Sequence, residues 1–204
     1  MKMVLKTKIA KYIAGIALAL SVTACASTQA PTKNAINASP AQTIEAQQPV
    51  YKVEQLSVTI PEELTVSEAN TFVPRADIVW REDPRGNRKH QVQAIMANAI
   101  AEGVSQVAEG QPVTMEVRVN LFHAVTEKAR YTVGGKHNIN FDYLLRDVNT
   151  GLPVAEIKNI DASFKAHGGR KAVAAEQRGE TQKVRITQRV RDIMYKEMIG
   201  NTES

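Results

Sequence analysis

Residues 113–121 read VTMEVRVNL, and this stretch decides the fold. Every second side chain in it is apolar, and polar side chains stand between them. Such alternation is typical of a β-strand with one buried and one solvent-facing side. The stretch INFDYLL at 139–145 repeats the pattern on the same odd positions. The two stretches therefore predict neighbouring antiparallel strands, with 113–123 beside 137–147.

Upstream of this pair the sequence predicts a strand and a helix. Residues 51–60 alternate in the same way until Pro61, and two shorter apolar pieces follow at 64–66 and 78–80. Apolar side chains then recur at three- and four-residue steps from 89 to 108. That spacing indicates a helix with one buried face.

Downstream the sequence predicts a further strand and a second helical region. Residues 147–151 favour a hairpin turn, and 154–164 then form a strand pattern with a bulge near Glu156. After the glycine pair 168–169 the pattern is helical almost to the end, and we expect Gly179 to divide it into a short and a long helix. The predicted buried stripe of the long helix is Val184, Thr187, Val190, Met194 and Met198.

Together these elements predict an α+β fold. The expected architecture is two-layer, a four-stranded largely antiparallel sheet with two helices on one face, in the order β-α-β-β-β-α. We expect a single domain over 51–200 and a disordered tail at 201–204. The composition, 43% hydrophobic and 23% charged, is typical of a globular chain.

Residues 1–24 have the pattern of a secretory signal peptide. They carry four lysines and no acid, then an apolar run over 12–20, then small residues. This order is typical of an export signal, and the run is too short for a membrane-spanning helix. We therefore expect the signal to be removed.

Residues 22–25, VTAC, resemble the lipobox of bacterial lipoproteins. The resemblance implies that Cys25, the single cysteine of the chain, is acylated and becomes the first mature residue. Each buried acyl CH₂ contributes roughly 0.8 kcal/mol, so two or three chains give stable membrane attachment. Ala26 stands where many inner-membrane lipoproteins carry Asp, which favours the outer membrane, facing the periplasm. The alternative is an ordinary cleaved signal with an incidental cysteine.

Residues 25–50 are interpreted as the lipidated cysteine and a disordered tether. The 24 residues 26–49 are built mainly from Ala, Thr, Gln, Asn, Ser and Pro. A segment with so few large apolar side chains cannot offset its ordering entropy. A flexible coil of this length has a root-mean-square reach of roughly 25 to 30 Å. The folded domain can therefore stand off the membrane.

The basic charge of the chain belongs mostly to the export signal. Lys and Arg number 26 against 21 Asp and Glu, but four of the lysines and none of the acids lie in residues 1–24. The mature chain then has 26 − 4 = 22 basic and 21 acidic side chains. We therefore expect no nucleic-acid partner. A single cysteine also excludes an internal disulfide framework and a Cys-rich zinc site.

The sequence shows no catalytic motif: it lacks G-x-S-x-G, H-E-x-x-H and a Walker phosphate loop. We therefore expect neither enzyme activity nor a cofactor. His123 and His137 flank the segment 124–136, and antiparallel pairing could bring their imidazoles together as the start of a metal site. The other interpretation is a polar rim where the strands leave the core.

The segment 124–136 is the preferred interaction site, because long loops on a rigid sheet often carry binding function. A basic helix face with Arg185, Arg189 and Lys196 could instead meet anionic headgroups, although such faces are usual for amphipathic helices. The candidate partner-binding residues are Glu127, Lys128, Arg130, Tyr131 and Lys136.

Three stretches resemble an uncharacterised family of proteobacterial lipoproteins with a domain of unknown function: IVWREDP at 78–84, EKARYTVGG at 127–135 and RGETQKVRIT at 178–187. The resemblance covers most of 51–200 and implies no activity. The predicted architecture is similar to small periplasmic lipoproteins that assist envelope assembly or transporters.

The sequence thus predicts a membrane-anchored lipoprotein whose non-enzymatic periplasmic domain binds an envelope protein. A carrier of a lipid or small amphiphile is the alternative. The oligomeric state stays open.

Overall fold

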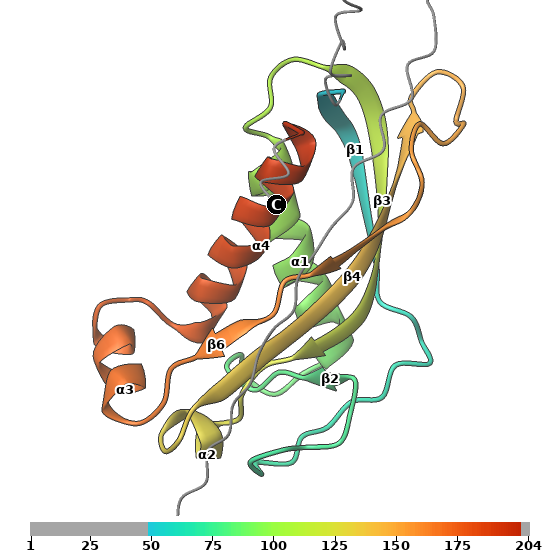
Figure 1. The fold of residues 1–204 in the computed structure, drawn as a ribbon. Helices are drawn as coiled ribbons and strands as arrows, with labels where there is room; N and C mark the ends of the chain where they lie inside the picture. The colour runs from blue at the N-terminus through green and yellow to red at the C-terminus, as the bar shows by residue number, and fades with distance from the viewer. Residues whose placement is uncertain (1–48, 201–204) are drawn as a thin grey trace, which may run out of the picture. The chain divides into compact units, whose positions relative to one another are not determined.

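The computed structural model describes residues 49–200, which form a sheet with helices on one face (Figure 1). The predicted signal peptide, Cys25, the predicted tether and residues 201–204 lie outside the described residues. Among residues 49–200, no helix is long and apolar enough to cross a membrane.

The sheet has six strands among the described residues, not the four that the sequence predicts. Its main path runs in the order β1-β3-β4-β5, while β2 pairs with β3 and β6 pairs with β4. The strands are β1 Tyr51–Thr59, β2 Ile78–Val79, β3 Gln111–His123, β4 Gly135–Asp147, β5 Lys158–Asp161 and β6 Phe164–Ala166.

The predicted antiparallel centre of the sheet is confirmed, but the first strand runs the other way. Strands β3 and β4 are antiparallel, as are β4 with β5 and β4 with β6. Strand β1 lies parallel to β3, and so does β2. The reason is that helix α1 intervenes between β1 and β3, and a helical crossover returns the chain to the same edge in the same direction.

Four helices lie among the described residues: α1 Arg88–Val104, α2 Glu127–Arg130, α3 Arg170–Gln177 and α4 Gln182–Met198. Figure 1 shows α1 and α4 side by side on one face of the sheet. Their backbones approach closely at Gly103 of α1, which has no side chain. A Cβ there would lie only 2.5 Å from the carbonyl oxygen of Arg191 in α4. The predicted layer of two helices is therefore present, and the described residues also contain the shorter helices α2 and α3.

The helix boundaries follow local capping chemistry. The Asn87 side chain accepts a hydrogen bond from the His90 N–H and begins α1, which ends at Val104, four residues before its predicted end. Gly179, with φ of +78°, lies between α3 and α4 as predicted, and Thr181 caps α4. Such caps satisfy backbone donors at the first helical turn.

The core fills the space between the two long helices and the sheet. Trp80 and Phe122 meet edge to face at 5.8 Å and are fully buried. The other buried side chains alternate along the strands and recur on one face of each long helix, including Val113, Met115, Val117, Val119, Ile139, Phe141, Leu145, Val92, Met96, Ile100, Ile186, Val190, Met194 and Met198.

Three local predictions are wrong. The register of β3 shifts between Val119 and Leu121, so Phe122 takes the core position and Leu121 is only half-buried. Residues 154–157 leave the predicted strand entirely, instead of forming a bulge near Glu156. In α4 the buried positions include Ile186, while Val184 is exposed.

Candidate functional site

The stretches 78–84, 127–135 and 178–187 meet at one end of the sheet, where β3 ends and β4 begins. Arg81 Nε donates to Glu127 Oε2 at 2.6 Å, which joins the first two stretches. Lys183 Nζ lies 2.8 Å from Asp83 Oδ1, which joins the first and third. We call this meeting place the motif junction, and it is the candidate functional region.

The segment 124–136 is not an open loop, because it contains α2 and is fixed to the neighbouring chain. Thr126 caps α2 by accepting a hydrogen bond from the Ala129 N–H, and its hydroxyl also donates to the carbonyl oxygen of Thr71 at 2.7 Å. The backbone N–H of Lys128 donates to Asn70 Oδ1 at 2.8 Å. These contacts hold α2 against residues 70–72, so its side chains have defined positions.

Arg130 is the central cation of the motif junction. Its side chain is 11% exposed and forms ion pairs with Glu82 at 2.9 Å and Glu176 at 3.1 Å. Removing one partner of a buried pair typically costs about 3–5 kcal/mol, because the other charge is left uncompensated. Arg130 therefore connects α2 to the 78–84 stretch and to α3 through ion pairs within the chain.

Glu127 is also engaged inside the motif junction. Burial alone raises its pKa, but the hydrogen bond from Arg81, a backbone hydrogen bond and the charges of Arg81 and Arg130 together bring that pKa below its usual value. A carboxylate held this way stays ionised and paired. Glu127 and Arg130, two of the predicted partner-binding residues, thus bind other parts of this chain.

A small cavity lies beside the motif junction, lined in part by His137, Arg130, Glu176 and Gln182. Its volume of about 10 Å³ has room for one water molecule. Within the described residues, both ring nitrogens of His137 and the Oε1 atoms of Glu176 and Gln182 have no hydrogen-bond partner. Arg130 Nε also has no hydrogen-bond partner, although it lies at ion-pair distance, 3.1 Å, from Glu176 Oε1.

His137 is the most perturbed imidazole in this region. It is 1% exposed, and the Phe164 ring lies 4.9 Å away. Burial, followed by the charges of Arg185, His167 and Arg130, lowers the pKa of His137 to about 3. The ring is therefore neutral at physiological pH.

The two glycine pairs of the sequence pack against each other at this place. A Cβ on Gly168 would lie 2.2 Å from the backbone nitrogen of Gly134, which itself has φ of +76°. The Gly169 N–H donates to the Arg130 carbonyl oxygen at 2.9 Å. The glycines therefore let the chain before α3 cross the start of β4 at backbone contact.

Large apolar side chains are exposed beside the motif junction: Phe72 is 50% exposed, Val73 78% and Val133 78%. Phe72, Val73 and Val133 line a hollow of about 300 Å³. Val133 also borders a second hollow of about 270 Å³. We call these three side chains and the two hollows the Val133 surface. Lys136 lines the first hollow, and Lys165, Lys171 and Arg185 line the second.

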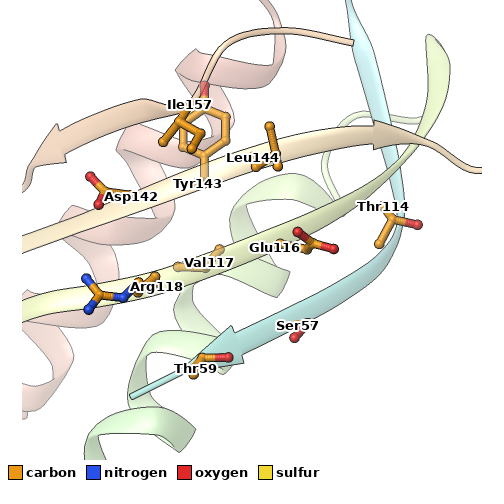
Figure 2. Close-up of a pocket in the computed structure, with 10 residues that line it drawn as sticks. All are labelled: Ser57, Thr59, Thr114, Glu116, Val117, Arg118, Asp142, Tyr143, Leu144 and Ile157. Carbon is orange, nitrogen blue, oxygen red and sulfur yellow. The ribbon is translucent and has the colours of Figure 1, made fainter. Parts of the chain in front are cut away.

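A separate hollow of about 440 Å³ lies on the outer face of the sheet, away from the helices (Figure 2). Its charged groups already have partners in the chain: Glu116 lies 3.0 Å from Arg146, Arg118 lies 2.7 Å from Glu63, and Asp142 accepts hydrogen bonds from Asn120 and Asn159. Ile157, which is 66% exposed, lies at its border. The charged side chains of this hollow are thus satisfied within the chain, and the apolar side chains of Leu144 and Ile157 lie beside them.

The remaining predicted binding residues lie at the surface. The Lys128 ammonium lies 4.8 Å from the centre of the exposed Phe72 ring. Tyr131 is 47% exposed, and its hydroxyl lies 3.3 Å from Glu176 Oε2. Lys136 is exposed and lines the Val133 surface.

The predicted meeting of His123 and His137 is wrong. The shifted register places His123 opposite Asn138. His137 lies on the core side of β4, while His123 lies on the other side of the sheet, because the shift after Val119 reverses the facing of the end of β3. Within residues 49–200, no cluster of three His, Cys, Asp or Glu side chains could hold a metal ion.

Sequence reasoning missed Phe72, Val73 and Glu176. A signal for the first two existed, since they are large apolar residues inside the otherwise mostly polar stretch 67–77. No comparable signal marks Glu176, which lies 46 positions from Arg130 and meets it only in the folded chain.

These features define a two-layer α/β domain with an internal ion-pair junction and an adjoining apolar and basic surface. The chain belongs to a family of unknown function, DUF6778, whose model matches residues 51–204. No curated protein matches the sequence.

Solved structures resemble the chain only loosely. A candidate lipoprotein from Caulobacter crescentus has 14% identity and a TM-score of 0.30, covering 53% of this chain and 83% of its own. An uncharacterised protein has 15% identity and a TM-score of 0.38, covering 74% and 90%. The PelC dodecamer from Paraburkholderia phytofirmans has 12% identity and a TM-score of 0.28, covering 71% and 92%. Scores this low carry no functional assignment.

Proposed function

We propose that this chain is a lipid-anchored protein of the bacterial cell envelope whose folded domain binds a protein partner and performs no catalysis. The observation that carries the binding role is the Val133 surface. Its three large apolar side chains are at least half exposed next to a fixed scaffold. Contiguous exposed apolar side chains of this kind mark interaction sites.

The anchor rests on the N-terminal sequence. Residues 1–24 have the order of an export signal, and VTAC at 22–25 resembles a lipobox with the chain's single cysteine at its end. Ala26 favours the outer membrane, with the domain in the periplasm. These residues lie outside the described structure, so the proposal depends here on sequence alone.

The proposal that the domain performs no catalysis is supported by the ion pairs that its charged side chains form within the chain. In the motif junction, Arg81, Arg130 and Lys183 are each paired with carboxylates of the same chain. Groups held in this way stabilise the fold and present no free nucleophile with a base beside it. The family-like stretches therefore build a structure, and the exposed surface next to them does the binding.

Labelling with a radioactive or alkyne fatty acid tests the anchor. The wild type is expected to incorporate the label and sediment with membranes, whereas Cys25→Ser incorporates none. The matched control Ser27→Ala should behave like the wild type. Equal labelling of wild type and Cys25→Ser refutes the anchor.

Site-specific photo-crosslinking in intact cells tests the binding role. A photo-reactive amino acid at position 73 or 133 is expected to give a discrete protein adduct. The same amino acid at position 157, on the outer face, is the matched comparison. Adducts from 157 with none from 73 or 133 would place the binding site elsewhere and reject the proposed surface.

The carrier alternative needs a cleft between the helices and the sheet. That space is occupied by core side chains such as Met96, Ile100 and Met194, all of them fully buried. The space between the helices and the sheet therefore gives no support to a ligand-carrier function. We prefer partner binding for this reason.

A further inference from the structure

We propose that the partner segment bound at the Val133 surface is acidic, with carboxylates against the lysines on both sides of Val133 and an apolar side chain beside it. This inference rests on the proposed function and adds the chemistry of the partner. It follows from where the lysines lie and from how the domain is attached.

Lysines without a carboxylate partner gather at the Val133 surface. Of the nine lysines in residues 49–200, four form ion pairs with carboxylates of the described chain. The other five have no carboxylate within ion-pair distance among the described residues, and four of these five border the Val133 surface. Those four are Lys128, Lys136, Lys165 and Lys171, while the fifth is Lys196.

No carboxylate lines either hollow of the Val133 surface. Glu180 lies close enough to influence His167 and Arg185, but its carboxylate pairs with Arg178 at 2.9 Å. Burial lowers the pKa of both His123 and His167 from the ordinary imidazole value, so these two rings favour the neutral form and the positive charge comes from other side chains. The surface is therefore positive because of its lysines and Arg185, and its complement is an acidic surface.

The apolar part of the surface fits a protein segment. Val133 stands between hollows of about 300 and 270 Å³, each large enough to receive side chains from a partner. Apolar contact at the centre with charge pairs at the rim is the usual composition of a protein interface.

The place where the chain enters the domain favours a protein partner over the anchoring bilayer. Tyr51 pairs with Gln111 at the start of β3, while Val133 lies just before β4, at the opposite end of the sheet. A strand of 13 residues such as β3 spans about 40 Å. A coil of residues 26–49 would reach only roughly 25 to 30 Å on average. The described chain thus begins at the end of the sheet opposite the Val133 surface, which favours a protein partner over the anchoring bilayer as its occupant.

Charge reversal in the full-length anchored protein tests this inference. The photo-reactive amino acid is placed at position 133, and the adduct is measured with and without the double change Lys165→Glu and Lys171→Glu. Both lysines are exposed, so the fold should persist. We expect the adduct to fall at least about tenfold, since like charges face each other across the interface. The control Lys52→Glu with Lys196→Glu changes the same number of charges away from the surface and should leave the adduct intact.

The milder change Lys165→Gln with Lys171→Gln removes the charges without reversing them and should give an intermediate loss. Mass spectrometry of the crosslinked peptide should show a segment rich in Asp and Glu.

The outcomes separate the inference from the proposed function. An adduct that survives both lysine double variants overturns the acidic partner but leaves the binding role standing. An adduct with phospholipid, or a captured segment without excess acid, also overturns the inference. If neither position 73 nor position 133 gives any adduct, the proposed function itself fails.

Discussion

Replacing the buried His137 imidazole should change how the stability of this domain depends on pH. The pKa of His137 is lowered to about 3 in the folded chain, first by burial and then by neighbouring Arg185, His167 and Arg130. In the unfolded chain the imidazole titrates near its ordinary value of 6.5. Between these two values the unfolded state binds a proton that the folded state does not. Stability therefore falls as the pH is lowered through about 6.5 towards 3.

The size of the effect follows from the two pKa values. Lowering the pH from about 7 to about 5 should cost about 2 kcal/mol of unfolding free energy through this one group. Carboxylates with lowered pKa values, such as Glu68 and Glu127, lose their stabilising contribution in the same direction but mostly at lower pH. These carboxylates are present in both the wild type and His137→Gln. The difference in unfolding free energy between the two proteins therefore isolates the contribution of His137.

Urea unfolding of the unacylated Cys25→Ser chain, lacking residues 1–24, measures the difference at a series of pH values. The wild type should lose about 2 kcal/mol more than His137→Gln between about pH 7 and pH 5. The matched control, exposed His90→Gln on α1, should keep the wild-type slope. If wild type and His137→Gln lose the same free energy over this interval, the neutral buried imidazole is refuted.

Three further predictions concern the same end of the fold. The Cβ added by Gly168→Ala would lie 2.2 Å from a backbone nitrogen, so this change should lower the unfolding free energy by at least about 2 kcal/mol. The control Gly86→Ala should lower it by less than about 1 kcal/mol. Equal losses in urea unfolding would contradict the backbone contact. Arg130→Met should destabilise by about 3–5 kcal/mol in urea unfolding, and a loss no larger than that of the exposed-pair control Arg178→Met would count against the ion-pair junction. Thr181→Ala removes the cap of α4 and should cost about 1 kcal/mol, measured as a lower thermal midpoint; an unchanged midpoint would show that the cap is dispensable.

The elements that sequence reasoning predicted well are those whose signal is local. Alternation along 113–119 and 139–145 identified β3 and β4 as an antiparallel pair. Gly179 was expected to divide the last helical region, and it does so with a positive φ. These patterns depend on residues adjacent in the chain, so they can be read without the partner segments.

The errors arise where one residue or one neighbour changes the outcome. The single register shift after Val119 turned His123 away from His137, although both positions have the same parity in the sequence. The direction of β1 depends on where the crossover through α1 returns the chain, which alternation cannot show. The segment 124–136 looked like a loop because α2 is only one turn long and is held by contacts to Thr71 and Asn70.

The sequence by itself predicts an export signal that ends at Cys25, and its alternation of apolar and polar residues predicts a sheet covered by helices. Only the tertiary structure decides which side chains form the Val133 surface and the motif junction. Arg81 meets Glu127 across 46 positions, and Lys183 meets Asp83 across 100. The lysines around Val133 come from α2, β4, β6 and α3. Whether a charge is paired or left exposed depends on which distant segment lies beside it, and that is settled by packing of the core.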